Sequence, residues 1–524
     1  MKVMSPERMG KYDQYAIREW GIPSSVLMEN AGRSFFRLMK ERYLKKGKKV
    51  AVVAGRGNNG GDGFVVARYT KLEDYEVSVY LLGRKEDLKG DAHLNMTLYE
   101  KIGGRIIEVK ESLDPLRSGL ERADLIVDAI FGTGFSGEVS GIEKEAIEMI
   151  NSACKTVLSI DIPSGLSGKT GRPSPICVKA DHTFTFAYPK LGHLLYPGAQ
   201  YTGRLTVIDI SIPPLAEKIL GWDAQFVEGE MLRGMLKERP PDSHKGTYGH
   251  AAVIAGSKGK TGAAYMASLS ALKIGAGLVT LVIPESLNFI LETKTTEVMT
   301  YPVPDGGMGH FTMESLEITK DFLTDKDVIV LGPGLSQERE ALEFARRIFL
   351  EVEKPFVIDA DGINAFREEP DLLKKGAERT LITPHPGEFS RLIKKTTKEI
   401  NEDRLGLGLE FVREYGIILV LKGARTLIFD SSGEVYINPT GNPSLAKGGS
   451  GDILTGFIGG LKSQGYSLLE SAIIGTYLHG YLADKWIEKH SEIDLLATDL
   501  LADLGIAVRE IRDGKERGYI EKTL

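Results

Sequence analysis

Short apolar runs that end in glycine or a polar residue recur along the chain, and this pattern restricts the possible folds more than any other feature. Residues 49–55 (KVAVVAG), 77–83 (VSVYLLG) and 123–132 (ADLIVDAIFG) are such runs, and stretches of helical character lie between them. Apolar strands that alternate with helices are typical of a mostly parallel sheet with helices on both faces. The sequence therefore predicts an α/β protein with a doubly wound sheet.

The alternation is interrupted once, which indicates two domains. A chain of 524 residues exceeds what one hydrophobic core usually supports. The strand and helix pattern breaks at residues 211–230 and restarts after a segment rich in proline, glycine and polar residues at 239–249. We therefore expect two α/β domains at residues 1–212 and 237–524, joined by a linker at 213–236.

Charge and cysteine content exclude several classes of protein. The chain has 66 basic and 72 acidic residues, a balance that implies neither nucleic acid nor an anionic membrane as a partner. Residues 263–283 are apolar but include Lys273 and Gly275, so they are expected to form a buried helix and strand, not a membrane span. Two cysteines without a CxxC motif argue against a disulfide framework or a zinc site. Because residues 1–14 have no apolar core of the kind a signal peptide needs, a reducing, cytoplasmic location is expected.

A glycine-rich loop at residues 55–63 (GRGNNGGDG) follows the first apolar strand. Glycines let the backbone approach a phosphate, and the start of the next helix supplies free N–H groups. A glycine turn that only closes a strand–helix unit gives the same pattern. An ordinary dehydrogenase is disfavoured, because the second strand ends at Leu82, Gly83 and Arg84 without the acid that holds the ribose.

Further polar residues follow the neighbouring strands of this first domain. Asp128 precedes a second glycine loop at 132–137, and a later strand leads into Asp161 and Ser164. In a parallel sheet the carboxyl ends of the strands share one edge, so these residues and Asn59 are expected to converge. Each aspartate alone could instead cap a helix or brace a loop. Oxygen-only side chains of low charge suit a hard monovalent or divalent cation.

The motifs GNNGGDG, DAIFGTG and SIDIPSG, in this order and spacing, resemble the NAD(P)HX epimerase family over residues 1–212. The resemblance implies a Rossmann-like fold and interconversion of the (R) and (S) epimers of hydrated NADH and NADPH at C6. It places Asp161 at the reacting carbon, where it would act as a general acid or base. It also implies a potassium ion held by Asn59, Asp128 and Ser164. The residues that would bind the hydrated nucleotide are Asn58, Asn59, Gly60, Gly61, Asp62, Gly132, Thr133, Gly134, Phe135, Ser136, Gly137 and Glu138.

A third glycine-rich element, at residues 448–452 (GGSGD), precedes an apolar helical stretch in the second domain. Its backbone N–H groups would form an anion cradle at a helix N-terminus. A carboxylate beside phosphates does not attract them, so Asp452 is expected to take a proton from a hydroxyl that attacks a phosphoryl group. The alternative, that Asp452 only caps the helix, is equally compatible with its position.

The GSGD element resembles the ribokinase-like superfamily. A wider set of motifs (SHKGTYG, GAGLVT, LGPGL, DADG, TPHPGE, LKGART and NPTGNPSLAKGGSGDILTG) is similar to the ADP-dependent NAD(P)HX dehydratase over about residues 240–510. The resemblance implies that ADP or ATP, with Mg²⁺, activates the C6 oxygen as a phosphate ester that then leaves. It implies nucleotide contacts at Lys422, Gly423, Ala424, Arg425, Thr426 and Gly451. Contacts to the hydrated cofactor are implied at Ala264, Gly334, His385 and Asp452, and Ala263 fits nearly as well as Ala264.

Both resemblances point to one metabolite, so a bifunctional nicotinamide nucleotide repair enzyme, expected to be a homo-oligomer, is the favoured interpretation. It would epimerise NADHX or NADPHX and dehydrate the (S) epimer. One alternative is a ribokinase-like kinase for a small molecule, such as a vitamin precursor, with a ligand-binding N-terminal domain. Another is an N-terminal domain that only binds a ligand or protein. The sequence does not distinguish ADP from ATP, or NADHX from NADPHX.

Overall fold

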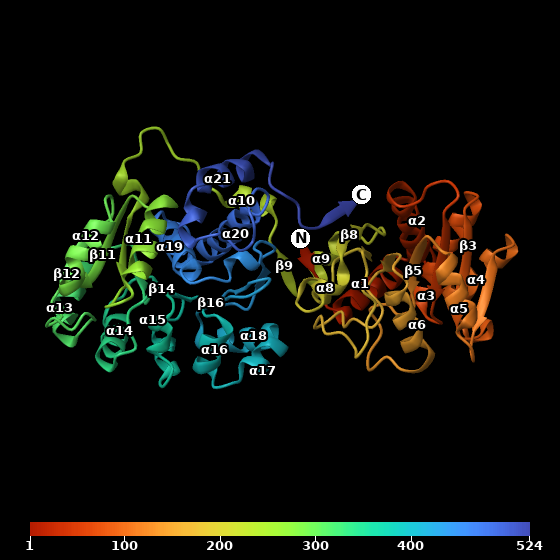
Figure 1. Ribbon diagram of the computed structural model, residues 1–524, viewed down its shortest axis with the longest axis horizontal. Coiled ribbons are helices and arrows are strands. Elements are labelled where there is room, and N and C mark those ends of the chain that lie inside the picture. Colours follow the sequence, from red (N-terminus) through yellow and green to blue (C-terminus); the bar gives the residue numbers. More distant parts are fainter. Residues whose placement is uncertain (524) are drawn as a thin grey trace. The chain divides into compact units, whose positions relative to one another are not determined.

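The computed structural model describes residues 1–523 and contains two compact units, each built around a largely parallel sheet (Figure 1). The N-terminal unit comprises residues 2–225 and 518–523, and the C-terminal unit comprises residues 226–517 with Met1. The division at residues 225 and 226 falls within the segment 213–236. No helix in the described part of the chain is both long enough and apolar enough to cross a membrane.

The sheet of the N-terminal unit has eight strands, and every neighbouring pair is parallel. Its order across the sheet is β19-β8-β7-β6-β5-β2-β3-β4. The strands are β2 (Lys49–Ala54), β3 (Glu76–Leu82), β4 (Arg105–Val109), β5 (Leu125–Ala129), β6 (Thr156–Ile160), β7 (His182–Phe186), β8 (Arg204–Ile208) and β19 (Glu521–Thr523). The predicted doubly wound sheet is thereby confirmed.

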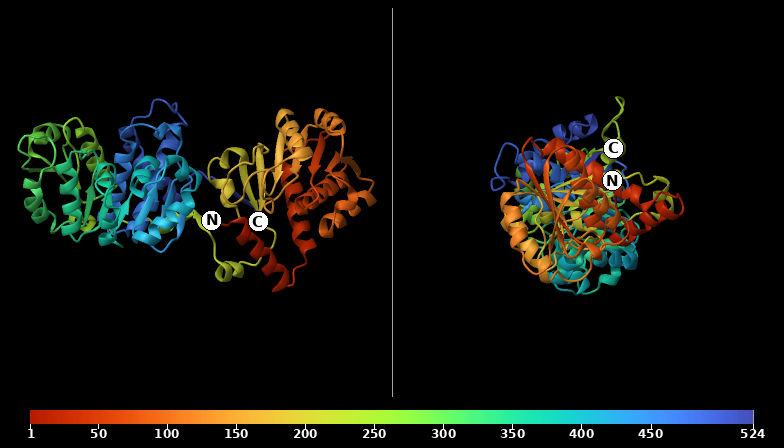
Figure 2. Two further views of the ribbon diagram at one scale, coloured as in Figure 1. Left: turned by 90° about the horizontal axis from the view of Figure 1, so that it is seen from below. Right: turned by 90° about the vertical axis from the view of Figure 1, so that its right-hand side faces the viewer.

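The residues of β2 explain why both faces of this sheet are covered. Successive side chains of a strand point to opposite faces. Val50 and Val52 pack into one core with helices α1 (Pro6–Arg18), α2 (Ser24–Arg42), α3 (Asn58–Leu72) and α4 (Gly90–Lys101). Ala51 and Val53 pack into a second core with α5 (Asp114–Arg122) and α6 (Gly141–Ser152). A strand that is apolar on both sides needs helices on both faces, and Figure 2 shows this layering from two further directions.

The order of the strands places a crevice between β2 and β5. From β2 the chain runs outward to β3 and β4, and then returns to β5 on the other side of β2. Loops therefore diverge at the carboxyl ends of β2 and β5, which is where doubly wound sheets bind ligands.

The last described residues belong to the N-terminal unit, which differs from the predicted domain range of 237–524. Strand β19 pairs in parallel with β8, with Lys522 opposite Val207. Arg42 and Glu521 form an ion pair that ties this strand to α2. The strand was missed because its residues, Glu521 to Thr523, are polar and carry no apolar alternation.

The sheet of the C-terminal unit is parallel over most of its width and ends in two antiparallel strands. The strands that lie wholly within this unit have the order β12-β11-β10-β13-β14-β15-β16-β17-β18. The strands are β10 (His250–Ile254), β11 (Leu278–Pro284), β12 (Met299–Val303), β13 (Val328–Leu331), β14 (Phe356–Ile358), β15 (Thr380–Ile382), β16 (Ile418–Leu421), β17 (Leu427–Phe429) and β18 (Val435–Ile437). Only β16–β17 and β17–β18 among these pairs are antiparallel.

Helices cover both faces of this second sheet as well. Figure 1 shows α11 (Thr261–Lys273), α19 (Ser450–Ser463) and α20 (Leu468–Trp486) on one side. On the other side lie α14 (Arg339–Glu351), α15 (Asp361–Asn364) and α16 (Pro386–Ile393). The loops after β10, β13, β14, β15 and β16 leave the same edge of the sheet, because these strands are parallel. The motif-bearing loops of the second domain are thus brought together at that edge.

Candidate active sites

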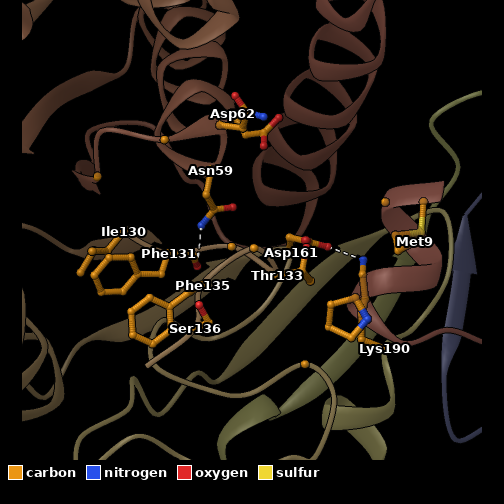
Figure 3. Close-up of a pocket in the computed structure, with 18 of the residues that line it drawn as sticks. Met9, Asn59, Asp62, Ile130, Phe131, Thr133, Phe135, Ser136, Asp161 and Lys190 are labelled. Carbon is orange, nitrogen blue, oxygen red and sulfur yellow. Dashed lines mark hydrogen bonds and ion pairs between the residues drawn. The ribbon is translucent and has the colours of Figure 1, made fainter. Parts of the chain in front are cut away.

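A cavity of about 1290 Å³ opens at the carboxyl edge of the N-terminal sheet (Figure 3). It is lined from α1, from the start of α3, from the loop after β5 and from the segments after β6 and β7. The predicted site residues that line it are Asn58, Asn59, Asp62, Gly132, Thr133, Gly134, Phe135, Ser136, Gly137, Glu138 and Asp161. The structure therefore brings most of the predicted residues to one cavity.

The first glycine loop is shaped by backbone contacts. A Cβ atom on Gly55 would lie 2.1 Å from the carbonyl oxygen of Ile130, and one on Gly60 would lie 2.0 Å from that of Gly55. Neither position tolerates a side chain. Gly60 and Gly61 lie inside the first turn of α3 and do not line the cavity, so they shape the loop.

Asp128 and Ser164, predicted to hold a cation, do not line the cavity. Both are fully buried, and the carboxylate of Asp128 accepts hydrogen bonds from Ser159 Oγ (2.8 Å), Ser164 Oγ (2.5 Å), and the backbone N–H groups of Ser164 and Ile130. Burial raises the pKa of Asp128, although these hydrogen bonds oppose the shift. All four partners are neutral, so they place no positive charge beside this carboxylate.

Asn59, in the first turn of α3, contacts the loop after β5 close to Ser164. Asn59 Nδ2 donates to the carbonyl oxygen of Phe131 (3.0 Å), and Ser164 Oγ lies 3.3 Å from the same oxygen. Asn59 and Ser164 thus meet at the carbonyl oxygen of Phe131, and Ser164 in turn contacts Asp128. Farther along the loop, the rings of Phe131 and Phe135 stack with centroids 4.3 Å apart and give the cavity an apolar wall.

Asp161 follows β6 and faces a buried lysine. Its Oδ1 atom accepts hydrogen bonds from Lys190 Nζ (2.5 Å) and Thr185 Oγ1 (3.0 Å), and the side chain of Lys190 is 1% exposed. Asp161 has a φ of +62°, a strained conformation of the kind that gathers at functional sites. Burial disfavours ionisation, but the charge and hydrogen bond of Lys190 outweigh it and lower the pKa of Asp161.

Two further carboxyl groups line this cavity, and their pKa values are raised, whereas the pKa of Asp161 is lowered. Burial raises the pKa of Asp13 to about 6, and Asp161 adds to the shift while Lys190 opposes it. Burial also raises the pKa of Asp62, and the charge of Asp161 contributes. Carboxyl groups whose pKa values are pushed apart can serve as acid and base in one site.

In the C-terminal unit, Asp452 lies in the first turn of α19, which begins after Gly449 in a left-handed conformation (φ +92°). Asp452 is the acidic residue of this first turn, and the N-cap residue Gly449 has no side chain with which to cap the helix. Burial raises its pKa to about 7, and the negative charge of Asp359 adds to the shift. A carboxylate with this pKa, beside the free N–H groups of a helix N-terminus, is suited to accept a proton near phosphate groups.

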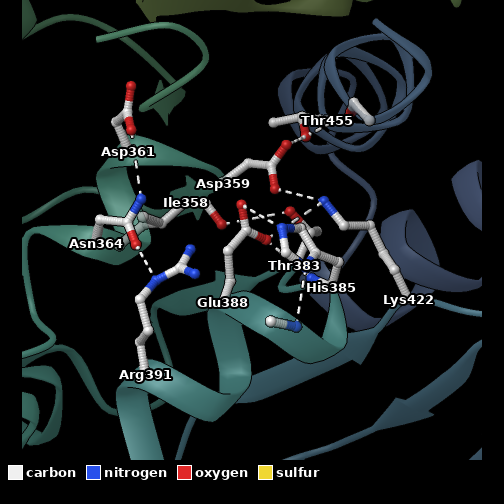
Figure 4. A network of polar contacts seen from close by, with 12 residues as sticks. Ile358, Asp359, Asp361, Asn364, Thr383, His385, Glu388, Arg391, Lys422 and Thr455 are labelled. Atoms are coloured by element: carbon white, nitrogen blue, oxygen red, sulfur yellow. Dashed lines mark hydrogen bonds and ion pairs between the residues drawn. The ribbon is translucent and has the colours of Figure 1, made fainter. Parts of the chain in front are cut away.

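Figure 4 shows a buried polar network around Asp359, Glu388 and Lys422, and the charges of these residues act on Asp452. Lys422 Nζ is 2.7 Å from Asp359 Oδ1 and 4.0 Å from Glu388 Oε2, and Thr455 Oγ1 donates to Asp359 Oδ2 (2.7 Å). Thr455 lies one turn after Gly451 in α19, so the network connects the glycine loop to the ends of β14 and β16. Burial disfavours the lysine's charge, but Asp359 and Glu388 outweigh it and raise the pKa of Lys422, which stays cationic.

The predicted nucleotide-binding loop after β16 is held in place by hydrogen bonds from Arg404. Arg404 donates to the carbonyl oxygens of Leu421 (2.9 Å) and Ala424 (2.8 Å). Gly423 and Ala424 are exposed, and Thr426 Oγ1 donates to the carbonyl of Gly423 (3.0 Å). The loop is thus held in shape while its tip remains open to solvent.

The other residues of the second domain that were predicted to contact the hydrated cofactor differ in how far they are exposed to solvent. His385 caps α16 through Nδ1, which accepts from the N–H of Gly387 (2.9 Å), and its side chain is 52% exposed. Gly334 approaches Ala263, since a Cβ on this glycine would lie 3.0 Å from that of Ala263. Ala264 is fully buried, so of the two alanines Ala263 is the one that reaches the loop surface.

Three charged residues near these sites were not found from the sequence. Lys190 follows β7 in the segment Tyr-Pro-Lys-Leu-Gly, and a lysine in an apolar segment at a strand's carboxyl end could have signalled it. Asp13 lies on α1, far from the motifs in sequence. Arg404 precedes its loop by a whole helix, α18 (Arg404–Tyr415), and offered no signal.

Within residues 1–523, His, Cys, Asp and Glu side chains form no group of three or more that could hold a metal ion. Cys154 and Cys177 are both free thiols.

Comparison with known families divides the chain in the same way as the fold. Residues 24–192 match the family described as "YjeF-related protein N-terminus", and residues 251–504 match the family described as "NAD(P)H-hydrate dehydratase".

Two curated relatives and one solved structure are similar to this chain. "Bifunctional NAD(P)H-hydrate repair enzyme Nnr" of Moorella thermoacetica is 40% identical over 520 residues, which cover 98% of each chain. The protein of the same name from Escherichia coli is 35% identical, with 92% of this chain and 89% of that protein covered. A crystal structure of the ADP/ATP-dependent NAD(P)H-hydrate dehydratase from Bacillus subtilis is 29% identical, with a TM-score of 0.48, and covers 55% of this chain and 99% of that one.

Proposed function

The chain belongs to the family of bifunctional NAD(P)H-hydrate repair enzymes, and from this premise we propose which residues carry out its two reactions. The N-terminal domain is the epimerase and the C-terminal domain is the dehydratase. The proposal rests above all on one observation: each domain holds a carboxyl group with a shifted pKa at the carboxyl edge of its parallel sheet.

For the epimerase we propose that the hydrated nucleotide binds in the large cavity, along residues 58–62 and 132–138. At C6 the substrate carries a hydroxyl group beside the ring nitrogen, so loss and return of water inverts the carbon. Asp161, ionised beside Lys190, would take the proton of the returning water. Asp13 or Asp62, whose pKa values are raised by burial, would supply the proton with which the hydroxyl group leaves.

We also propose that Asn59, Asp128 and Ser164 hold a potassium ion. The residues fit this role, because Asn59 and Ser164 meet at the Phe131 carbonyl, Ser164 contacts Asp128, and the buried Asp128 has only neutral hydrogen-bond partners. A bound monovalent cation would supply the missing positive charge and hold the loop after β5 beside the substrate.

The potassium proposal predicts that epimerisation slows when choline replaces potassium as the only monovalent cation. Binding to the folded state alone also stabilises it, by about 2.7 kcal/mol at a concentration about 100 times the dissociation constant. Thermal unfolding of the N-terminal unit should therefore shift upward with potassium in the wild type, and not in Asp128→Asn. Equal rates and equal unfolding temperatures in the two buffers would disprove the proposal.

For the dehydratase we propose that Asp452 removes the proton of the C6 hydroxyl while that oxygen attacks the terminal phosphoryl group of ADP or ATP. The N–H groups of residues 448–451 and the positive end of α19 would stabilise the transferring charge. Phosphate then leaves C6 with assistance from the ring nitrogen, and loss of a proton from C5 to water restores the ring double bond of NADH or NADPH. Gly334 and His385 would contact the hydrated cofactor, together with Ala264 or, because Ala264 is fully buried, its neighbour Ala263.

The nucleotide would bind along residues 422–426 and at Gly451, with the cationic Lys422 directed toward its phosphates. Mg²⁺ would accompany the phosphates, since this ion is commonly held by few protein ligands together with phosphate oxygens and water. We also propose that the protein is a homo-oligomer and that it is located in the cytoplasm. Comparison of the dehydration rates with ADP and with ATP would show which nucleotide the enzyme prefers.

The proposal as a whole is tested with a mixture of both NADHX epimers, supplied in parallel with ADP or ATP. We expect complete recovery of the dihydronicotinamide absorbance, with one free phosphate released for each NADH formed. Recovery that stops when the (S) epimer is consumed would contradict the epimerase assignment. A stable phosphorylated product without NADH would favour the kinase alternative.

A further inference from the structure

Lys190 is an almost fully buried cation at the wall of the epimerase cavity. Its ammonium group contacts Asp161 Oδ1 (2.5 Å), Thr185 Oγ1 (2.8 Å) and the carbonyl oxygen of Phe186 (3.1 Å). An ammonium group has three N–H donors, and these three acceptors use all of them. The orientation of the lysine is therefore fixed, and Figure 3 shows its contact with Asp161 inside the cavity.

The backbone around this ion pair is also fixed. Asp161 directly follows β6, Thr185 belongs to β7, and these two strands are paired in the sheet. The N–H of Lys190 donates to His193 Nδ1 (3.0 Å), which lies in the short helix α7 (Leu191–Leu194). The N–H of Asp161 donates to the carbonyl oxygen of Phe184 (2.8 Å), which holds its left-handed backbone in place. The lysine and the aspartate thus meet on rigid elements.

Lys190 is the cation that contacts Asp161, and the carboxyl groups of Asp13 and Asp62 line the same cavity. Asp13 comes from α1, Asp62 from α3 and Asp161 from the end of β6, and among the residues described only Asp161 forms an ion pair with Lys190. The other titratable group that faces the pair is His193, and burial and the charge of Lys190 lower its pKa to about 3, so it is neutral. The geometry therefore selects which carboxyl group carries the negative charge.

We propose that Lys190 is a positioning residue of the epimerase, which holds Asp161 as an anion and fixes the direction of its carboxylate toward the cavity. The inference rests on the proposed role of Asp161. Lys190 acts through the aspartate, because among the described residues its ammonium group pairs with Asp161 and with neither Asp13 nor Asp62. Burial favours the protonated forms of Asp13 and Asp62, so the site can hold a base and an acid together.

The test compares Lys190→Met with Lys190→Arg in the full-length protein, using conversion of the (R) epimer into the (S) epimer. Without the cation the pKa of Asp161 rises, so a larger fraction of Asp161 is protonated at a given pH. We expect Lys190→Met to lower kcat by about 10- to 100-fold at neutral pH, with a smaller change in KM. The acidic limb of its pH profile should move to higher pH, and Lys190→Arg should restore the wild-type limb and part of the rate.

A double-mutant cycle keeps the test decisive if Lys190→Met folds poorly. Asp161→Asn with Lys190→Met leaves no unpaired buried charge, which favours folding. If the lysine acts through the aspartate, adding Lys190→Met to Asp161→Asn causes no further loss of rate.

Two results would count against parts of this scheme, and they can be told apart. If Asp161→Asn loses its epimerase activity while Lys190→Met keeps the wild-type rate and pH profile, the inference about Lys190 is wrong and the role of Asp161 stands. A wild-type rate in Asp161→Asn overturns the role of Asp161 itself.

Discussion

Replacing Asp452 by asparagine is expected to lower the rate of NADHX dehydration by at least about 100-fold, the lower end of what a positioned general base contributes. Asparagine has the size and shape of aspartate, so packing at the start of α19 is preserved. It does not accept a proton at neutral pH, and the C6 hydroxyl would then have to attack the phosphoryl group while still protonated. The measurement is the recovery of dihydronicotinamide absorbance from the (S) epimer with saturating nucleotide.

The pH dependence of the wild type gives an independent check on Asp452. A general base is active in its deprotonated form, and burial together with Asp359 raises the pKa of this carboxyl to about 7. The dehydration rate should therefore rise with pH through about 7 and level off above it. This rise is expected to be absent from the residual activity of Asp452→Asn.

Two controls separate catalysis by Asp452 from a structural role. Nucleotide binding to Asp452→Asn, measured by calorimetry, should remain close to that of the wild type, because the anion cradle is made by backbone groups. Glu470→Gln removes another acid from the first turn of a helix, where its carboxylate accepts from the N–H of Ser467 (2.8 Å), and should leave the dehydration rate nearly unchanged. Similar losses in both variants, or a wild-type rate in Asp452→Asn, would refute the assignment of Asp452 as the base.

The fold could be predicted from the sequence wherever a strand is apolar on both faces. The run at 49–55 predicted β2, and its neighbours predicted a parallel sheet with ligand loops at the carboxyl edge. Strand β19 could not be predicted, because its residues are polar and the strand is stabilised by its pairing with β8 and by the ion pair between Arg42 and Glu521. Local pattern carries no information about such long-range pairing.

The candidate sites could be predicted as sets of loops, but their electrostatics could not. Asp161 stood out as a polar residue after an apolar strand, yet its ionisation depends on Lys190, which is contributed by the loop after a different strand. Asp452 likewise owes its raised pKa to burial and to Asp359 at the end of β14. These shifts arise from charges that the fold brings together, and sequence spacing does not encode the distances between them.

Replacing Asp161 by asparagine is expected to lower the rate of epimerisation by at least about 100-fold and to leave dehydration of the (S) epimer unchanged. Asparagine tolerates the left-handed backbone that Asp161 adopts, so the turn after β6 is retained. Its Oδ1 atom can still accept hydrogen bonds from Lys190 and Thr185, but it cannot take a proton from water. With a mixture of epimers and saturating nucleotide, NADH should form rapidly from the (S) epimer and then stop, with the (R) epimer left over.

The loss in Asp161→Asn has to be distinguished from damage to the cavity. Lys190 would lose its anion, but Asp13 and Asp62 lie at the same cavity and can give up a proton to balance the lysine's charge, which limits the loss of stability. Asp124→Asn is the matched control, because Asp124 accepts from the N–H of Lys49 (2.9 Å) at the amino end of the sheet, away from the cavity. Its epimerisation rate should equal that of the wild type. If Asp161→Asn instead consumed both epimers at the wild-type rate, proton transfer would have to be reassigned to Asp13 or Asp62, and the ion pair with Lys190 would be left with a structural role only.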